Sequence, residues 1–495
     1  MKLINNTTTK KPIIGKHVLD TLSIGMYNNP LMVLREYIQN STDAIDDFCK
    51  TDKAFRSKAK ITININGVNR SLSVRDDGIG IPAPKAWDVI HNLGKSTKKV
   101  FYNRGFRGIG RLGGLGYCEK LIFITKARGE NKVSTSIWDC NKLRNLVVSE
   151  NTSIDASAII KNTTNFSCEK YSGDTKDHFF IVEMQNIKSS RDVLMDVPAV
   201  RSYIAQVAPV PFNKGSFSKA SQIEKVLRTK VPSYETYKIY VNDEQIFKPY
   251  KDRICIGKSV TDKISDVDFI ELGNGSGILA YGWVANLQLL GMIDGSENID
   301  GMRIRIGNIL IGDKDNLSEF FKERRFNSYL AGEIHIVDSR LVPNSRRDDF
   351  EDNGVKDELY DCFIKEIGIP LSRRIREMSD VRSQQRNLAR YGYLVETAKK
   401  IINNGYFSTV QKKKIIDELK RIQESKKEDI NIDECKTIIE GIAKSRHFLD
   451  INHKGISGKL KDTIRVIFEI IYQKCSSKQE AENTIEYIIR KVLKK

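Results

Sequence analysis

Three polar side chains fall on one face of a predicted helix near the start of the chain. Glu36, Asn40 and Asp43 stand at positions i, i+4 and i+7, so on a helix with 3.6 residues per turn they form one stripe. A carboxylate in such a stripe can act as a base toward water, and an amide oxygen can coordinate magnesium. The competing interpretation is an ordinary amphipathic surface helix whose polar stripe faces solvent.

Two glycine-rich stretches follow, Asp76-Asp-Gly-Ile-Gly80 and Arg104-Gly-Phe-Arg-Gly-Ile-Gly-Arg-Leu-Gly-Gly-Leu-Gly116. Part of the second spells the dinucleotide fingerprint, but no apolar strand precedes it to place the turn. Gly94-Lys-Ser96 resembles the end of a phosphate loop, yet Val89 stands where that loop needs a glycine. We therefore interpret residues 104–116 as a mobile lid whose backbone N–H groups surround phosphate oxygens.

Together these motifs resemble the ATP-binding domain of the GHKL superfamily, which includes gyrase B subunits, heat-shock chaperones, MutL proteins and histidine kinases. The pattern Glu-x-x-x-Asn-x-x-Asp-Ala, then Asp-x-Gly-x-Gly, then a glycine-rich lid spans residues 30–120 in the family's order. The resemblance implies that ATP and Mg²⁺ are the cofactors. It also implies that Glu36 activates the attacking water and that Asn40 coordinates Mg²⁺.

The resemblance implies a second set of contacts, to the base and the phosphates. Asp76 would accept the adenine amino group, with Gly78 and Gly80 letting the backbone close on the base; a plain hairpin turn is the alternative for this motif. The other implied nucleotide contacts are Asp43, Asn92, Lys98, Gly108, Gly110, Gly113, Gly114, Gly116 and Thr175. A solvated side chain is the alternative for Lys98, and extra residues separate Thr175 from the strand that follows it.

A possible catalytic arginine comes from a later part of the chain. Asn344-Ser-Arg346-Arg347 resembles the stretch by which the middle domain of heat-shock chaperones brings an arginine to the γ-phosphate, with one residue fewer between Asn and Ser. We predict Arg346 first and Arg347 second for this role. The alternative is a surface pair facing Asp348 and Asp349. An arginine supplied by a second domain would make hydrolysis depend on domain closure.

Composition limits the class of protein. The chain has 495 residues, a net charge of +18 and no run of eighteen apolar residues, so no membrane span is expected. Its eight cysteines are scattered without a Cys-x-x-Cys pair, which indicates reduced thiols in a cytoplasmic protein rather than a zinc site. Residues 380–495 hold 25 Lys and Arg against 16 Asp and Glu, a net +9. That excess is typical of nucleic-acid binding, and a solvated lysine-rich surface is an equal alternative.

The predicted fold class is α+β. Alternating apolar and polar residues predict a hairpin at 60–66 and 71–75 and further strands at 121–127 and 179–184. With the resemblance, this implies a Bergerat-type ATP-binding α/β sandwich at 1–190, a transducer-like α/β domain at 191–355 and an all-helical region at 356–495. In the second domain the pattern predicts a hairpin at 237–247 and a helix over 317–329. The helical region would serve dimerisation or the binding of a partner or nucleic acid.

Two functions remain open within the family. In the first, the protein is an ATPase that works as a nucleotide-gated homodimeric clamp, chaperone-like on a protein client or a partner subunit. In the second, it is a DNA-associated clamp ATPase, similar to MutL or gyrase, or a component of phage defence. Chaperones of this type tend to end in an acidic motif, whereas this chain ends Arg490-Lys-Val-Leu-Lys-Lys495.

Overall fold

The computed structural model describes residues 16, 19, 29–92, 110–149, 155–257, 260–275, 277–344, 346–406, 409–424, 432–445, 458–475, 477–488 and 491. The chain divides into two compact units, residues 1–375 and 376–495. Two predicted site residues, Lys98 and Gly108, lie outside the described residues.

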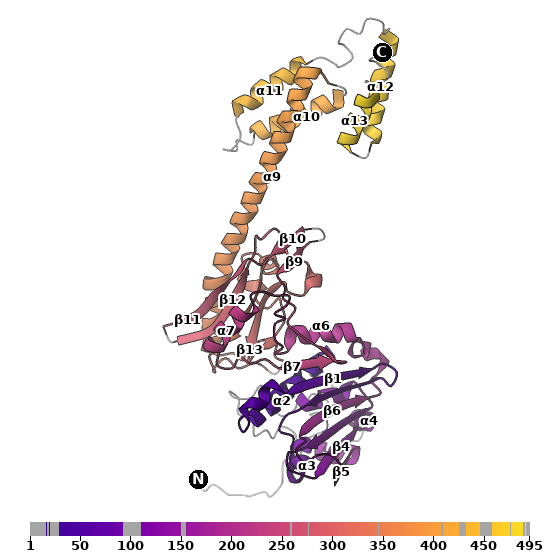
Figure 1. Cartoon of the computed structure of the whole chain (residues 1–495), viewed down its shortest axis with the longest axis vertical. Helices are drawn as coiled ribbons and strands as arrows, with labels where there is room; N and C mark the ends of the chain where they lie inside the picture. Colours follow the sequence, from indigo (N-terminus) through magenta and orange to yellow (C-terminus); the bar gives the residue numbers. More distant parts are fainter. Residues whose placement is uncertain are drawn as a thin grey trace, which may run out of the picture. The chain divides into compact units, whose positions relative to one another are not determined.

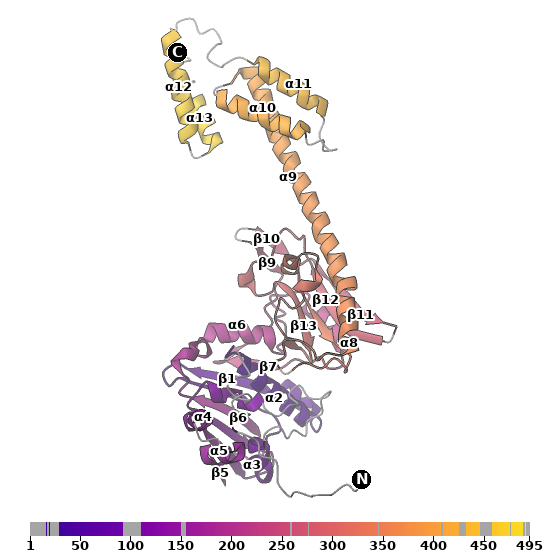
Figure 2. The ribbon, with the colours of Figure 1, turned by 180° about the vertical axis from the view of Figure 1, so that it is seen from behind.

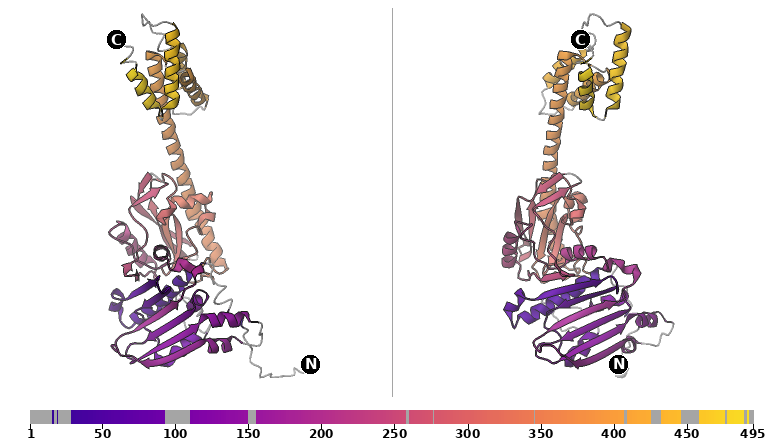
Figure 3. Two further views of the ribbon diagram at one scale, coloured as in Figure 1. Left: turned by 90° about the vertical axis from the view of Figure 1, so that its right-hand side faces the viewer. Right: turned by 45° about the vertical axis from the view of Figure 1, so that its right-hand side comes forward.

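An eight-stranded sheet forms one layer of the first unit (Figure 1). Its order is β5 (Thr164–Lys170), β4 (Lys132–Asp139), β3 (Lys120–Lys126), β6 (Phe179–Gln185), β2 (Ser71–Asp76), β1 (Lys60–Asn66), β7 (Lys238–Val241) and β8 (Glu244–Gln245). The predicted hairpin is β1 and β2, with Ile63 opposite Val74. β6 lies between β2 and β3, so Asp76, Phe180 and Thr125 stand side by side across three strands. Figure 3 shows this sheet from two further sides.

Helices cover one face of this sheet. They are α2 (Met32–Cys49), α3 (Ala83–His91), α4 (Cys140–Val148), α5 (Ala156–Thr163) and α6 (Val197–Val207), and all of them add side chains to one core. The strands contribute alternate residues to this core, such as Val74, Val182 and Phe123, which lie opposite one another in the ladders. The predicted α+β sandwich is confirmed, because burial of these apolar faces joins the sheet to its helices.

The hairpin predicted at 237–247 belongs to the first sheet rather than to the second domain. β7 pairs in parallel with β1, with Ile61 opposite Ile239 and Ile63 opposite Val241. The strand β1 would otherwise present an unpaired edge. The side chain of Asn242 accepts from the Ile65 N–H at 2.8 Å and so continues the pairing. The first sheet therefore extends past the predicted boundary at residue 190.

A second, five-stranded sheet follows in the first unit (Figure 2). Its order is β11 (Asp266–Asn274), β12 (Gly277–Asn286), β15 (Ala331–Ile336), β13 (Gly301–Ile306) and β14 (Ile309–Ile311). β9 (Arg253–Ile256) pairs with β10 (Val260–Lys263) beside it, α7 (Ala220–Lys230) contacts β12, and α8 (Gly354–Cys362) contacts β11. This part of the chain is mixed α/β, as predicted.

The helical stretch predicted over 317–329 forms as two short 3-10 helices, η5 (Ser318–Phe320) and η6 (Arg324–Tyr329), rather than as one regular α-helix. The side chain of Asn327 is buried, accepts from the Met302 N–H at 2.9 Å and donates to the Lys314 carbonyl at 2.8 Å. Such bonds from a side chain to distant backbone groups compete with those of a regular helix.

The second unit is helical, as predicted. α9 (Ile369–Asn404) begins within the last residues of the first unit, and α10 (Thr409–Glu424), α11 (Ile432–Lys444), α12 (Gly458–Lys474) and α13 (Lys478–Ile488) follow it. Leu394, Ile401, Ile415, Leu419 and Ile442 belong to an apolar core shared by α9, α10 and α11. Within the described ranges, no helix combines the length and the apolar character needed to cross a membrane.

Candidate active site

The polar stripe of α2 is buried, so the surface-helix interpretation does not hold. Glu36 is 7 % exposed and Asp43 is 1 % exposed, while Asn40 is half-buried. On the other side of the helix, Leu34 and Ile38 are buried in the core. Because burying a charged side chain costs free energy unless other groups stabilise it, the neighbours of Glu36 decide what this stripe can do.

The glycine-rich stretch approaches α2 more closely than side chains would allow. It forms a buried 3-10 turn, η2 (Gly110–Gly116), in which a Cβ on Gly110 would lie 2.3 Å from Glu36 Oε2. The Gly114 N–H donates to the Tyr37 hydroxyl at 3.0 Å. The predicted lid glycines Gly110, Gly113, Gly114 and Gly116 all lie in this turn. In this conformation the Gly114 N–H is engaged by α2, so a role in binding phosphate requires that bond to open.

The Asp76 motif forms the turn that follows β2, and it also packs on α2. Asp76 is buried, and its Oδ1 accepts from the Gly78 N–H at 2.9 Å. The Ile79 N–H donates to the Ala44 carbonyl of α2 at 3.0 Å. A Cβ on Gly78 would lie 2.5 Å from that of Ala44, and Gly80 has a φ of +66°, a conformation that glycine adopts without strain. The turn therefore brings Asp76 to the helix that carries Glu36.

An arginine of the second domain reaches the buried carboxylate of α2. Arg347 Nε lies 3.1 Å from Glu36 Oε1, and both side chains are 10 % exposed. Arg347 has a φ of +57°, so the chain turns between it and its exposed neighbour Arg346. The sequence ranked Arg346 first, whereas the structure places Arg347 against Glu36. Arg347 is buried, so the alternative interpretation of a surface pair facing Asp348 and Asp349 does not hold for it.

Backbone contacts fix the loop that carries Arg347. Arg35, the residue before Glu36, donates from Nη2 to the Arg346 carbonyl at 3.0 Å. The Gly312 N–H donates to the Arg347 carbonyl at 2.8 Å, which ties the loop to the end of β14. Two successive residues of α2 thus hold two successive residues of the second domain.

Asn92 and Thr175 each accept a hydrogen bond from a basic side chain through their carbonyls. Asn92 ends α3, and its carbonyl accepts from Arg111 Nη2 at 2.8 Å, so it anchors the start of η2. Burial lowers the pKa of Arg111 to about 10. Thr175 is exposed in the turn between β5 and β6, where its carbonyl accepts from Lys126 Nζ at 3.0 Å.

Thr125 lies beside the turn that follows Asp76 and was not among the residues predicted from the sequence. It is 1 % exposed, its hydroxyl accepts from the Ile81 N–H at 2.9 Å, and it lies on the same face of the sheet as Asp76, with Phe180 between them. The alternation Leu121, Phe123, Thr125 along β3 was the available signal, because it places this hydroxyl on the apolar face of the strand.

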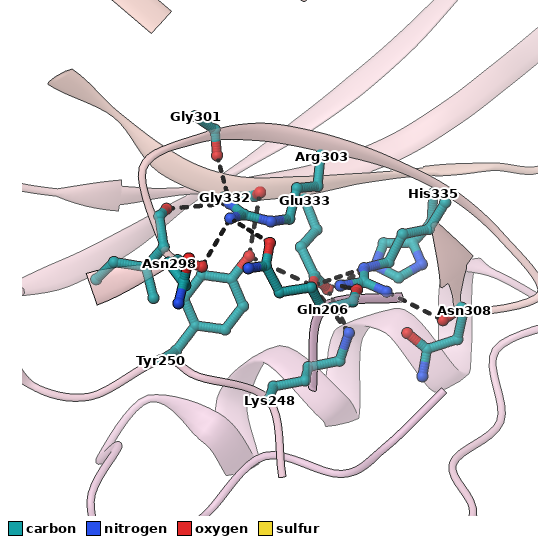
Figure 4. A network of polar contacts seen from close by, with 12 residues as sticks. Gln206, Lys248, Tyr250, Asn298, Gly301, Arg303, Asn308, Gly332, Glu333 and His335 are labelled. Atoms are coloured by element: carbon teal, nitrogen blue, oxygen red, sulfur yellow. Dashed lines mark hydrogen bonds and ion pairs between the residues drawn. The ribbon is translucent and has the colours of Figure 1, made fainter. Parts of the chain in front are cut away.

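A buried charge cluster lies in the second sheet (Figure 4). Glu333 Oε1 accepts from Lys248 Nζ at 2.8 Å and from Arg305 Nε at 2.7 Å, and His335 Nε2 lies 3.2 Å from Oε2. All four side chains are at most 1 % exposed. Burial by itself would raise the pKa of Glu333, but Arg305 and Lys248 hold it well below its usual value. Burial lowers the pKa of His335 to about 4.

Two arginines of the second sheet also donate hydrogen bonds to helix α6, which packs on the first sheet. Arg305 Nη2 donates to the Gln206 carbonyl at 2.8 Å, and Arg303 Nη2 donates to the Gln206 side chain at 3.0 Å (Figure 4). Cations at the last turn of a helix are favourable because its carbonyls carry partial negative charge. Tyr203 on the same helix is affected by the charges of Arg35 and Glu36, while burial raises its pKa to about 12. The helix α6 thus connects the cluster with the surroundings of Glu36.

Raising the pH from 7 to 9 is expected to stabilise the first unit through Lys248. Burial and the nearby Arg305 lower the pKa of Lys248 from 10.5 to about 7. Between these values the unfolded chain binds a proton that the folded chain does not, so the free energy of unfolding rises with pH. Denaturant unfolding of wild type and Lys248→Met at pH 7, 8 and 9 tests this. Equal pH slopes in the two proteins would contradict it.

The part of the chain that holds this site is similar to known ATPases. Residues 27–171 match the family model described as histidine kinase-, DNA gyrase B-, and HSP90-like ATPase. The chaperone protein HtpG of Rickettsia canadensis is 24 % identical over 397 residues, covering 74 % of this chain and 56 % of the relative. HtpG of Natranaerobius thermophilus is 24 % identical over 258 residues, covering 48 % of this chain and 40 % of the relative. The chain spans about half the length of the curated relatives it matches.

The matched residues carry the stripe of α2, the turn at Asp76 and the glycine-rich η2. Glu36 and Asp76 are buried there, on two elements that touch at Ala44. The sandwich at the start of the chain is an ATPase domain of the GHKL superfamily, in a chain that resembles the heat-shock chaperones of that superfamily.

Proposed function

We propose that the protein binds and hydrolyses ATP, with its second domain supplying a catalytic arginine. The observation that carries this proposal is the contact of Arg347 with Glu36. Glu36 acts as the general base that takes a proton from the attacking water. Arg347 stabilises the negative charge that develops on the γ-phosphate, as an arginine finger does.

Asp76 binds the adenine amino group in this proposal. One oxygen of its carboxylate is oriented by the Gly78 N–H, and the buried surroundings favour a hydrogen bond to a base over one to water. Asp76→Asn replaces an acceptor oxygen by a donor and should abolish ATP binding, as isothermal titration would measure. Retained affinity in that variant would refute the adenine assignment.

Asn40 is suited to coordinate a magnesium ion, both by its amide oxygen and by its position on α2. It stands one turn along α2 from Glu36, is half-buried and offers an amide oxygen, a ligand type that magnesium accepts. One protein ligand is enough, since Mg²⁺ keeps several waters and takes phosphate oxygens. When bound, the ion would neutralise charge on the phosphates.

The ion pair of Glu36 with Arg347 has to open before Arg347 can contact a phosphate and Glu36 can act on water. A bound triphosphate competes for the guanidinium, and transfer of Arg347 to the γ-phosphate frees Glu36 to act on water. Turnover then depends on how the second domain holds its loop against α2.

We further propose that the protein works as a homodimeric clamp on protein clients or on a partner subunit. The similar proteins from Rickettsia canadensis and Natranaerobius thermophilus are named as chaperones, and this favours a protein target. Light scattering with and without a non-hydrolysable ATP analogue measures the oligomeric state. Turnover stimulated by an unfolded protein supports a protein target.

Duplex DNA is the second candidate target, favoured by the net charge of +9 in residues 380–495. A DNA clamp should show turnover that rises with duplex DNA and an affinity that falls steeply with salt, because phosphate contacts release counterions. The same turnover assay with unfolded protein and with DNA across a salt series separates the two functions.

Gly110→Ala is expected to lower ATP turnover at least tenfold while ATP affinity stays within a few-fold. The added Cβ would lie 2.3 Å from Glu36 Oε2, so the flexible carboxylate has to move, and small misplacements of a catalytic group are costly. Gly67→Ala is the control, because a Cβ there meets nothing within 4 Å. Normal turnover in the Gly110 variant would show that this contact does not position the base.

A further inference from the structure

A histidine, His178, contacts the backbone of the turn that follows Asp76. The Gly78 carbonyl lies 2.7 Å from His178 Nδ1, while the Gly78 N–H donates to Asp76 Oδ1 at 2.9 Å. A neutral or protonated imidazole with a proton on Nδ1 can donate this bond. Gly78 therefore links two side chains, with its N–H bound to the proposed adenine acceptor and its carbonyl bound to His178.

His178 is itself fixed in place. Its ring stacks on that of Phe48 in α2, with centroids 4.1 Å apart and planes 18° apart, and Phe55 lies 5.1 Å away. The carbonyl of the preceding Asp177 accepts from Lys126 Nζ at 2.6 Å, and this lysine is 0 % exposed. Both the ring and the backbone of His178 are thus held by buried groups of the ATPase domain.

We propose that His178 is a positioning residue for the base-binding turn, an inference that rests on the proposed binding of ATP at Asp76. The Gly78 carbonyl and the Ile79 N–H belong to one peptide group, which is held by His178 on one side and by the Ala44 carbonyl on the other. Without the bond from His178 this peptide group can tilt about its remaining bond, the torsions of Gly78 change with it, and the adenine amino group meets a poorly aligned Asp76.

The expected effect is on base recognition and not on the chemical step. Adenine presents an amino group where guanine presents a carbonyl oxygen, so an aligned carboxylate favours ATP over GTP. His178 does not contact Glu36 or Arg347 in any interaction of the described residues, so turnover at saturating ATP should be preserved.

Two variants separate the hydrogen bond from the stacking. His178→Phe keeps an aromatic ring against Phe48 and removes the donor, whereas His178→Asn keeps an N–H near the position of Nδ1 and removes the ring. We expect about tenfold weaker ATP binding in H178F, equivalent to about 1.4 kcal/mol, with a smaller preference for ATP over GTP and kcat within twofold. In H178N, ATP affinity should stay within threefold of wild type. The exposed Lys176 of the same turn gives the control, K176A, with no change.

The ranking of the variants decides the question. Calorimetry with ATP and GTP, kcat and thermal unfolding are measured on the full chain. Weaker ATP binding in H178N than in H178F would mean that packing on Phe48 matters and would overturn the proposal. Normal affinity in H178F, beside lost binding in Asp76→Asn, would overturn this inference and leave the proposed function standing.

A third variant keeps the proposal testable if H178F does not fold. Phe48→Leu keeps an apolar side chain against the imidazole and retains the donor, so its ATP affinity should stay within threefold of wild type. A tenfold loss in that variant would overturn the proposal. Absence of ATP binding by the wild-type protein would instead overturn the proposed function on which the inference rests.

Discussion

Replacement of Glu36 by alanine is expected to leave ATP bound while turnover falls by several hundred-fold or more, on the order of 3–4 kcal/mol in the barrier. Glu36 is 7 % exposed, so few water molecules would compete for its carboxylate, and a water bound there would be shielded from bulk solvent. Glu36→Gln keeps the shape and removes the base, so it should lose nearly as much turnover. Steady-state phosphate release and ATP titration give the two quantities.

The control for this experiment lies on the same helix. Asp47 is a half-buried acid of α2 that pairs with the exposed Lys50 at the surface, and such surface pairs contribute little. Asp47→Ala should therefore retain both binding and turnover. Hydrolysis at the wild-type rate in Glu36→Ala would show that another group acts as the base.

The sequence was sufficient to predict those features that depend on residues close together in the chain. The stripe of Glu36, Asn40 and Asp43 depends only on helical periodicity, and the structure has α2 across all three. The turn at Asp76 depends on glycines that allow close approach and a positive φ, which the sequence states directly. The hairpin of β1 and β2 follows from strict alternation between two short strands.

The sequence was insufficient where residues far apart in the chain determine the outcome. The pairing of β7 with β1 joins positions near 240 and 61, and nothing in either segment specifies it. The Asn327 side chain disrupts a helical pattern because of partners at 302 and 314. The buried Glu333 was not singled out, since its three basic partners come from separate strands and a connecting segment.

The order of the two arginines is the clearest case of this kind. Both share the same motif, and sequence spacing cannot decide which side chain points at α2. That choice depends on the φ of +57° at Arg347 and on the bond from Arg35 to the Arg346 carbonyl. A backbone torsion and a contact across more than 300 residues therefore determine which guanidinium meets Glu36.

Replacement of Arg347 by alanine is expected to lower turnover at least tenfold, about 1.4 kcal/mol or more, with ATP affinity within a few-fold of wild type. Arg347 is 10 % exposed and 3.1 Å from Glu36, so it lies beside the proposed general base. A desolvated guanidinium stabilises developing negative charge more strongly than one in water. Arg347→Lys keeps the charge without the planar fork and should recover only part of the rate.

Arg346→Ala is the matched control, because this neighbour is exposed and contributes its carbonyl, which the substitution leaves in place. It should therefore lose much less turnover than Arg347→Ala. Single-turnover kinetics at saturating ATP compares the chemical step in the two variants, and thermal unfolding checks that removing the partner of Glu36 has not destabilised the fold. The opposite ranking, with Arg346→Ala the slower enzyme, would mean that the loop rearranges on binding ATP and that the order predicted from the sequence is the catalytic one. Equal and normal turnover in both would mean that the second domain supplies no catalytic group, and that the contact with Glu36 serves only to hold the two domains together.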